Sequence, residues 1–121
     1  MGTLYNDLGG DPVIERIVEL HYRRVMADPQ LARFFQGRDM SAQRRKFQRY
    51  LHTITDGPLK QSALELRAAH ARAVEAGLNE EGFDAFARHF ESALAEAGIN
   101  STLADRLRDS IQRGRRDVLG G

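Results

Sequence analysis

The feature that most constrains this chain of 121 residues is the helical spacing of its apolar side chains. They recur every three to four residues in separate runs, which places them on one face of a helix. No run rich in Val, Ile and Thr alternates apolar with polar residues, as a half-buried strand would. The sequence therefore predicts an all-α fold of about five helices, in a single domain over residues 1–121.

The first long helix has a clear start signal. Gly9 and Gly10 turn the chain, Asp11 is expected to be the N-cap, and Pro12 occupies the first helical position. The apolar face predicted for this helix consists of Val13, Ile14, Ile17, Val18, His21, Tyr22 and Val25.

The remaining helices are separated by turn signals. They are predicted over residues 41–55 and 62–76, from an N-cap at Asn79 to Gly98, and from an N-cap at Asn100 or Ser101 onward. The segment Asp56-Gly57-Pro58 ends one of them, because a proline disfavours helical backbone in the residue before it. We expect Gly57 to take the left-handed conformation there, and Gly77 to close the helix over 62–76 as a left-handed cap.

Composition excludes several classes of protein. Lys and Arg number 18 and Asp and Glu 17, so the net charge of +1 gives no general footprint for nucleic acid or an anionic membrane. The absence of cysteine excludes disulfides, thiolate zinc sites and iron–sulfur clusters. No signal peptide and no membrane span is evident, so a cytoplasmic monomer is expected. The basic run Arg44, Arg45, Lys46 and Arg49 is interpreted as a solvated face.

His70 is the histidine with the most interesting surroundings. It lies on the apolar side of its predicted helix, with Leu66 one turn before it and Val74 one turn after it. A core histidine hydrogen-bonded to a neighbour is the commoner case of this pattern. The alternative is an axial ligand to a haem iron, for which an imidazole in an apolar pocket is a usual donor.

Tyr22 and Gln43 are polar residues at inner helical positions. Gln43, Lys46, Phe47 and Tyr50 share one side of the helix over 41–55. A buried tyrosine or glutamine is costly without hydrogen-bond partners. Two interpretations stay open: Tyr22 donates to a backbone carbonyl while Gln43 lies at the rim, or the two form a hydrogen-bonding pair over a bound ligand.

Several segments together resemble the group I truncated haemoglobins, over about residues 3 to 119: TLYNDLGGDPVI, HYRRVMADPQLARFFQGRDM, LRAAHARAVEAGLNEEGFDAF and ALAEAGI. The resemblance implies a two-over-two helical sandwich around non-covalent haem b, with the first globin helix reduced to a stub. It also implies binding of dioxygen, NO and CO, for oxygen transport or storage. The alternatives are a nitric oxide dioxygenase served by a separate reductase or electron donor, and a haem-free interaction module.

The resemblance also implies roles for individual residues. His70 is expected to be the proximal iron ligand, and Tyr22 the distal donor to bound dioxygen, supported by Gln43. The haem pocket is expected to include Phe34, Phe35, Leu66 and Phe83, with Phe35 as the wedge against the haem. No histidine occurs in the last helix, so the histidine–vinyl cross-link of some relatives is not expected.

Three residues depart from the pattern that the family usually shows. His21 stands where many members have phenylalanine, and Phe47 replaces a second distal glutamine. Lys46 occupies a position that either pairs with a haem propionate or swings in to bind the iron. We favour the propionate, because an exposed ammonium loses little solvation there. His21 is the second candidate for an internal iron ligand.

Overall fold

A computed structural model describes residues 3–57, 71, 74–115 and 119 of the chain. Its elements, in chain order, are α1 (Leu4–Leu8), α2 (Asp11–Met26), α3 (Pro29–Ala32), the 3-10 turn η1 (Arg33–Phe35), α4 (Met40–Thr55), α6 (Glu80–Glu96) and α7 (Ser101–Arg113). The described part of the chain contains no strand, which confirms the predicted all-α fold. None of its helices has the length and apolar character that crossing a membrane requires.

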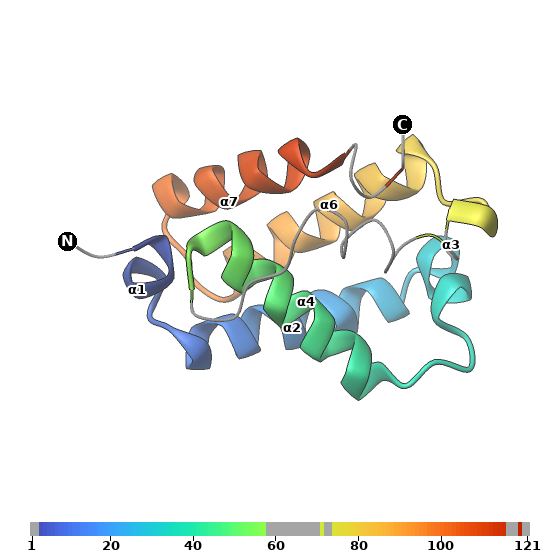
Figure 1. Cartoon of the computed structure of the whole chain (residues 1–121), viewed down its shortest axis with the longest axis horizontal. Coiled ribbons are helices and arrows are strands. Elements are labelled where there is room, and N and C mark those ends of the chain that lie inside the picture. The colour runs from blue at the N-terminus through green and yellow to red at the C-terminus, as the bar shows by residue number, and fades with distance from the viewer. Residues whose placement is uncertain (1–2, 58–70, 72–73, 116–118, 120–121) are drawn as a thin grey trace.

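The helices form two pairs that pack on each other (Figure 1). In one pair α4 runs back along α2, and in the other α7 runs back along α6. The most extensive contact joins the pairs, between α2 and α6. The core between them is apolar, and its most deeply buried side chains include Ile14, Ile17, Val18 and Val25 of α2 with Phe90 and Leu94 of α6. This is the two-over-two arrangement expected from the resemblance.

Side-chain caps fix where the later helices begin. The Asn79 side chain accepts a hydrogen bond from the Gly82 amide at 3.1 Å, and Asn100 caps α7 in the same way. The Asn79 cap was predicted from the sequence, and of the two caps left open for the last helix Asn100 is the one that forms. Asp39 caps α4 by accepting from the Ser41 amide at 2.9 Å. Each such cap satisfies amides that the helix itself leaves without a partner.

The predicted N-cap of α2 was wrong. Gly10 is the cap residue, with φ of 76°, and Asp11 is already the first helical residue. Without a Cβ, Gly10 can take the left-handed backbone that turns the chain after α1. The Asp11 carboxylate is then free to contact Nε2 of His52 at 2.8 Å. The pair joins the start of α2 to the last turns of α4.

The turn after α4 also differs from the prediction. Asp56, and not Gly57, takes the left-handed conformation, with φ of 61°. Aspartate tolerates this region better than most residues. Gly57 is required for space instead, because a Cβ there would lie 2.6 Å from Nδ1 of His52 and 2.8 Å from the Tyr5 ring. Most of the predicted helix over 62–76 lies outside the described residues, whereas Gly77 has the φ of 110° expected of its cap.

Candidate functional site

A group of seven rings fills the space between α2, α4 and α6, and is called the aromatic cluster here. Phe47 of α4 is its centre and is 7% exposed. Its ring stacks on Tyr50 at 6.0 Å and meets Phe86 edge to face at 5.5 Å. Such pairs add to the free energy gained from burial alone. The members of the cluster are His21, Tyr22, Phe35, Phe47, Tyr50, Phe86 and Phe90.

Tyr22 and Gln43 lie together, although 21 residues separate them in the sequence. The Gln43 amide donates to the Tyr22 hydroxyl oxygen at 3.4 Å. Tyr22 is almost fully buried, and its ring meets Phe35 and Phe47 edge to face at 5.8 Å and 5.7 Å. The structure thus contains the hydrogen bond that one of the two interpretations left open by the sequence requires.

The Tyr22 hydroxyl retains a proton that it can donate. Its oxygen accepts from Gln43, and no acceptor for its own proton is found among the described residues. Burial raises the pKa of Tyr22 above its ordinary value, and the Gln43 hydrogen bond opposes only part of that rise. The hydroxyl is therefore protonated at neutral pH. The arrangement is a buried donor surrounded by apolar rings.

His21 lies one residue before Tyr22 and is completely buried. Its ring is 4.3 Å from Phe86 and 4.9 Å from Phe47, centroid to centroid. Neither ring nitrogen has a hydrogen-bond partner in the described part of the chain. Burial lowers the pKa of His21 to about 3; the charge of His89 adds to the fall, and the His89 backbone opposes part of it. His21 is therefore neutral in the fold, and its position is costly because two polar nitrogens are desolvated without compensation.

The residues that were expected around the haem edge do not lie together in the structure. Lys46 is exposed on α4. The Arg33 guanidinium lies 4.1 Å above the Phe34 ring, and Arg33 also donates to the carbonyl of Ala76 at 3.3 Å. Phe35, the next residue, turns its ring toward Tyr22. The two adjacent phenylalanines thus differ, since Phe35 belongs to the aromatic cluster and Phe34 packs beneath Arg33.

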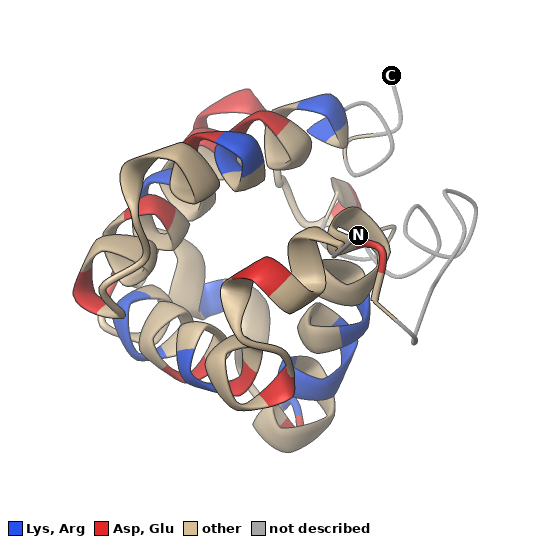
Figure 2. Cartoon of the chain, turned by 90° about the vertical axis from the view of Figure 1, so that its left-hand side faces the viewer, with Lys and Arg blue, Asp and Glu red and all other residues tan. Residues whose placement is uncertain are grey.

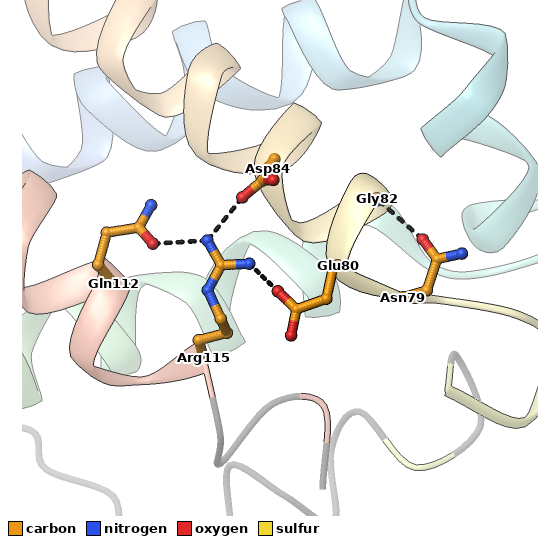
Figure 3. A network of polar contacts seen from close by, with 6 residues as sticks. All are labelled: Asn79, Glu80, Gly82, Asp84, Gln112 and Arg115. Atoms are coloured by element: carbon orange, nitrogen blue, oxygen red, sulfur yellow. Dashed lines mark hydrogen bonds and ion pairs between the residues drawn. The ribbon is translucent and has the colours of Figure 1, made fainter. Parts of the chain in front are cut away.

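Phe83, another residue expected in the haem pocket, lies beneath Arg115 near the start of α6, with the guanidinium 4.6 Å from its ring. Arg115 donates to Asp84 at 2.6 Å and also to Glu80 (Figure 3). These carboxylates raise the pKa of Arg115. The network joins the first turns of α6 to the chain just beyond the end of α7.

We expect Arg115→Met to destabilise the fold by about 1 kcal/mol. The effect is modest because Glu80 and Asp84 are 70% and 48% exposed, so water screens the charges. Urea denaturation at low and high salt measures the loss, which should shrink as salt rises. Arg106→Met on the exposed side of α7 is the control and should change stability little. Equal losses in the two variants would contradict this role of the network.

The structure does not describe the predicted proximal residues, since His70 and Leu66 lie outside the described part of the chain. It does show a contact that the sequence analysis missed. The Asp28 side chain caps α3 through one oxygen and contacts Nε2 of His89 on α6 through the other, at 2.8 Å. This pair fixes the chain just before Phe34 and Phe35. An aspartate before a proline signals the cap, but no local pattern signals the histidine.

The family model for bacterial-like globins matches residues 3–119 of this chain. The chain belongs to that family. The sequence is 36% identical over 103 residues to the group 1 truncated haemoglobin of Nostoc sp. (strain MUN 8820), covering 84% of this globin and 83% of that relative. The resemblance to truncated haemoglobins drawn from the sequence is thereby confirmed.

Solved structures agree with this assignment. The 2/2 haemoglobin from Synechococcus sp. PCC 7002, in the cyanomet state and with covalently attached haem, has a TM-score of 0.92 and 32% identity, covering 99% of this globin and all of that chain. The truncated haemoglobin from Tetrahymena pyriformis, in its Fe(III) form, has a TM-score of 0.86 and 28% identity, with 99% and 100% coverage.

Membership of a globin family indicates haem binding, and the described residues fit such a group. The aromatic cluster provides the apolar wall that a porphyrin requires. Tyr22 provides a buried hydroxyl whose proton has no acceptor among the described residues. A polar ligand held at a haem iron would supply that acceptor.

Proposed function

We propose that this globin is a haem b protein that binds dioxygen and other diatomic ligands reversibly. Haem, when bound, supplies an iron atom that coordinates such ligands. His70 would hold the iron, as the resemblance implies. The Tyr22 hydroxyl would donate a hydrogen bond to the ligand, while the Gln43 amide holds the tyrosine oxygen. The hydrogen bond between the buried Tyr22 and the half-buried Gln43 is the observation that carries the proposal.

A hydroxyl of Tyr22 that donates would favour one diatomic ligand over another. Dioxygen, when bound, would offer it a charged acceptor, whereas CO would offer a nearly neutral one. A hydrogen bond to a charged acceptor is about twice as strong as one between neutral groups. Because Tyr22 stays protonated at neutral pH, the donor is available throughout the physiological range. The Tyr22 donor therefore favours the retention of dioxygen.

An absorption titration of the purified chain with haemin tests the proposal. We expect one equivalent to bind with a sharp Soret band, which shifts after reduction with dithionite and again after addition of CO. Extraction with acidified butanone should remove all of the haem, because α7 contains no histidine that could form a covalent link. A broad spectrum like that of free haemin would overturn the proposal. A haem that resists extraction would overturn non-covalent attachment alone.

We also propose that Lys46 stabilises the haem through a propionate. Lys46 follows Gln43 by three residues, so both lie toward the same side of α4, and Lys46 is exposed. An exposed ammonium can pair with a carboxylate while keeping most of its hydration. To bind the iron it would first have to lose its proton, from a group whose ordinary pKa is about 10.4.

Lys46→Ala separates these two roles. We expect an unchanged spin state in the ferric spectrum and a faster loss of haem to apomyoglobin, by about fivefold, because one surface ion pair is worth up to about 1 kcal/mol. Conversion of a low-spin ferric spectrum to high-spin would instead show that Lys46 coordinates the iron. Lys46→Arg is the matched control, and it should keep haem as tightly as the natural chain does.

A further inference from the structure

The charges of this globin are distributed unevenly among its helices. α4 carries four basic residues and no acidic one, namely Arg44, Arg45, Lys46 and Arg49. The whole chain has a net charge of only +1, so the residues outside α4 are net negative. On α6, five acidic residues accompany a single arginine. On α2 and α7 the two signs are mixed. Figure 2 shows the Lys and Arg positions in blue and the Asp and Glu positions in red.

The three arginines of α4, Arg44, Arg45 and Arg49, lie on its outer face, and Lys46 lies between this face and the side of Gln43. Arg44, Arg45, Lys46 and Arg49 are all exposed, whereas Phe47 and Tyr50 between them are buried. Arg45 and Lys46 form no ion pair with an acidic residue of the described chain, and the Arg44 guanidinium contacts the Ser41 hydroxyl, at 3.4 Å. Arg45 and Arg49 are one helical turn apart, where like charges repel. The first half of α4 thus keeps a concentrated positive charge that the described carboxylates do not neutralise.

This face lies directly behind the proposed ligand site. The inner side of α4 contributes Gln43 and Phe47 to the surroundings of Tyr22, so one helix separates the basic face from them. A helix with its side chains is about 10–12 Å across. A protein docked on the outer side of α4 is therefore held that close to the ligand site.

We infer that the outer face of α4 is a docking surface for an acidic electron-transfer protein. The inference rests on the proposed function, since dioxygen binds ferrous haem and an oxidised iron has to be reduced again. The transfer is of one electron: the donor is oxidised, the ferric iron becomes ferrous, and no bond is made or broken. Opposite charge steers such a partner to α4 and orients it there.

The overall charge argues against a polyanion such as nucleic acid. Nucleic acid and anionic membranes present extended negative charge, which the acidic residues of α6 would repel and which a near-neutral chain does not attract as a whole. A compact acidic patch on a protein matches a positive face that spans residues 44–49, about 8 Å along the helix axis. The charge complementarity is therefore local, as in an encounter between two small proteins.

The test uses a reduced acidic [2Fe–2S] ferredoxin and the ferric haem-loaded globin in a stopped-flow apparatus. We expect the second-order rate of haem reduction to fall steeply as ionic strength rises. Arg44→Glu with Arg45→Glu should lower that rate about tenfold at low salt, because it replaces attraction by repulsion. Neither residue belongs to the proposed ligand site. The double variant should still fold, because a carboxylate at position 45 is attracted to Arg49 one turn later. The control Arg106→Glu on α7 should change the rate less than twofold.

Two further measurements make the result decisive. Reduction by dithionite should proceed at the same rate in the natural chain and both variants, which shows that the haem site is intact. Calorimetric titration of the oxidised ferredoxin into the haem-free and the haem-loaded chain tests docking without electron flow, so a failure to bind haem is distinguished from a failure to dock.

Three outcomes would overturn the inference. One is an equal loss of rate in the α4 double variant and in Arg106→Glu. The second is binding through Arg44 and Arg45 to a DNA duplex or to phosphatidylserine vesicles, with no binding of ferredoxin. The third is self-association at low salt that the double variant abolishes, which would place α6 of a second copy on this face.

Discussion

His21→Phe is expected to make the fold resistant to mild acid. The imidazole is neutral in the folded protein because burial lowers its pKa to about 3, whereas in the unfolded chain it binds a proton below about pH 6.5. Between these two values the unfolded state holds the extra proton, so stability falls as the pH falls. The complete shift corresponds to about 5 kcal/mol, all of it retained above pH 6.5 and lost on approaching pH 3.

Phenylalanine at this position has no group to protonate and leaves no nitrogen without a partner. It also suits the surroundings, since Phe47, Phe86 and Phe90 already enclose the site. At neutral pH we expect the variant to be as stable as the natural chain or more stable, by about 1–3 kcal/mol, because an unsatisfied buried group is removed.

Urea denaturation followed by circular dichroism at pH 7, 6, 5 and 4 measures the effect. The difference in unfolding free energy between His21→Phe and the natural chain should widen steadily toward low pH. His52→Gln is the control, because it removes a histidine that contacts Asp11 outside the aromatic cluster but leaves His21 in place. Curves for His21→Phe and the natural chain that stay parallel would show that His21 is not held neutral.

Tyr22→Phe is expected to speed the release of dioxygen by about one to two orders of magnitude. The variant removes the donated hydrogen bond, and a hydrogen bond to a charged acceptor is worth about 1.5–3 kcal/mol. The phenyl ring retains the contacts with Phe35 and Phe47, so the pocket keeps its shape. The variant should therefore release dioxygen faster, while its rate of CO release changes little.

Displacement of dioxygen by excess CO in a stopped-flow apparatus measures this rate. Gln43→Leu should have a smaller effect in the same direction, because it leaves the tyrosine hydroxyl in place but frees its oxygen from the Gln43 amide. Tyr5→Phe is the matched control, since Tyr5 packs against His52 at the other end of α4. If Tyr22→Phe releases dioxygen at the natural rate, the tyrosine does not stabilise the ligand.

Most of the helical architecture was predictable from the sequence because its signals are local. The side chains of Asn79 and Asn100 act on amides three residues away, so their effect does not depend on the rest of the fold. Helical periodicity likewise identified the face of α2 that became part of the core, and the side of α4 that carries the buried Phe47 and Tyr50. The inner positions of Tyr22 and Gln43 followed from the same spacing, whereas the roles expected for them came from the resemblance.

The tertiary structure alone decided which of these residues meet. Asp11 could cap its own helix or reach His52, and the turn at Gly10 determined the second outcome. Likewise the close approach of Tyr5 and His52 decided that position 57 has no room for a side chain, while Asp56 took the left-handed position.

His21 on α2 shows most clearly what the sequence determined and what the tertiary structure decided. The sequence by itself determined that His21 lies on an apolar face, and only the packing of α4 and α6 enclosed it without a partner in the described chain. The physical reason is the distance along the sequence over which each effect acts. Caps and periodicity act within a few residues, whereas a buried group's partners and its solvation depend on helices that are distant in sequence.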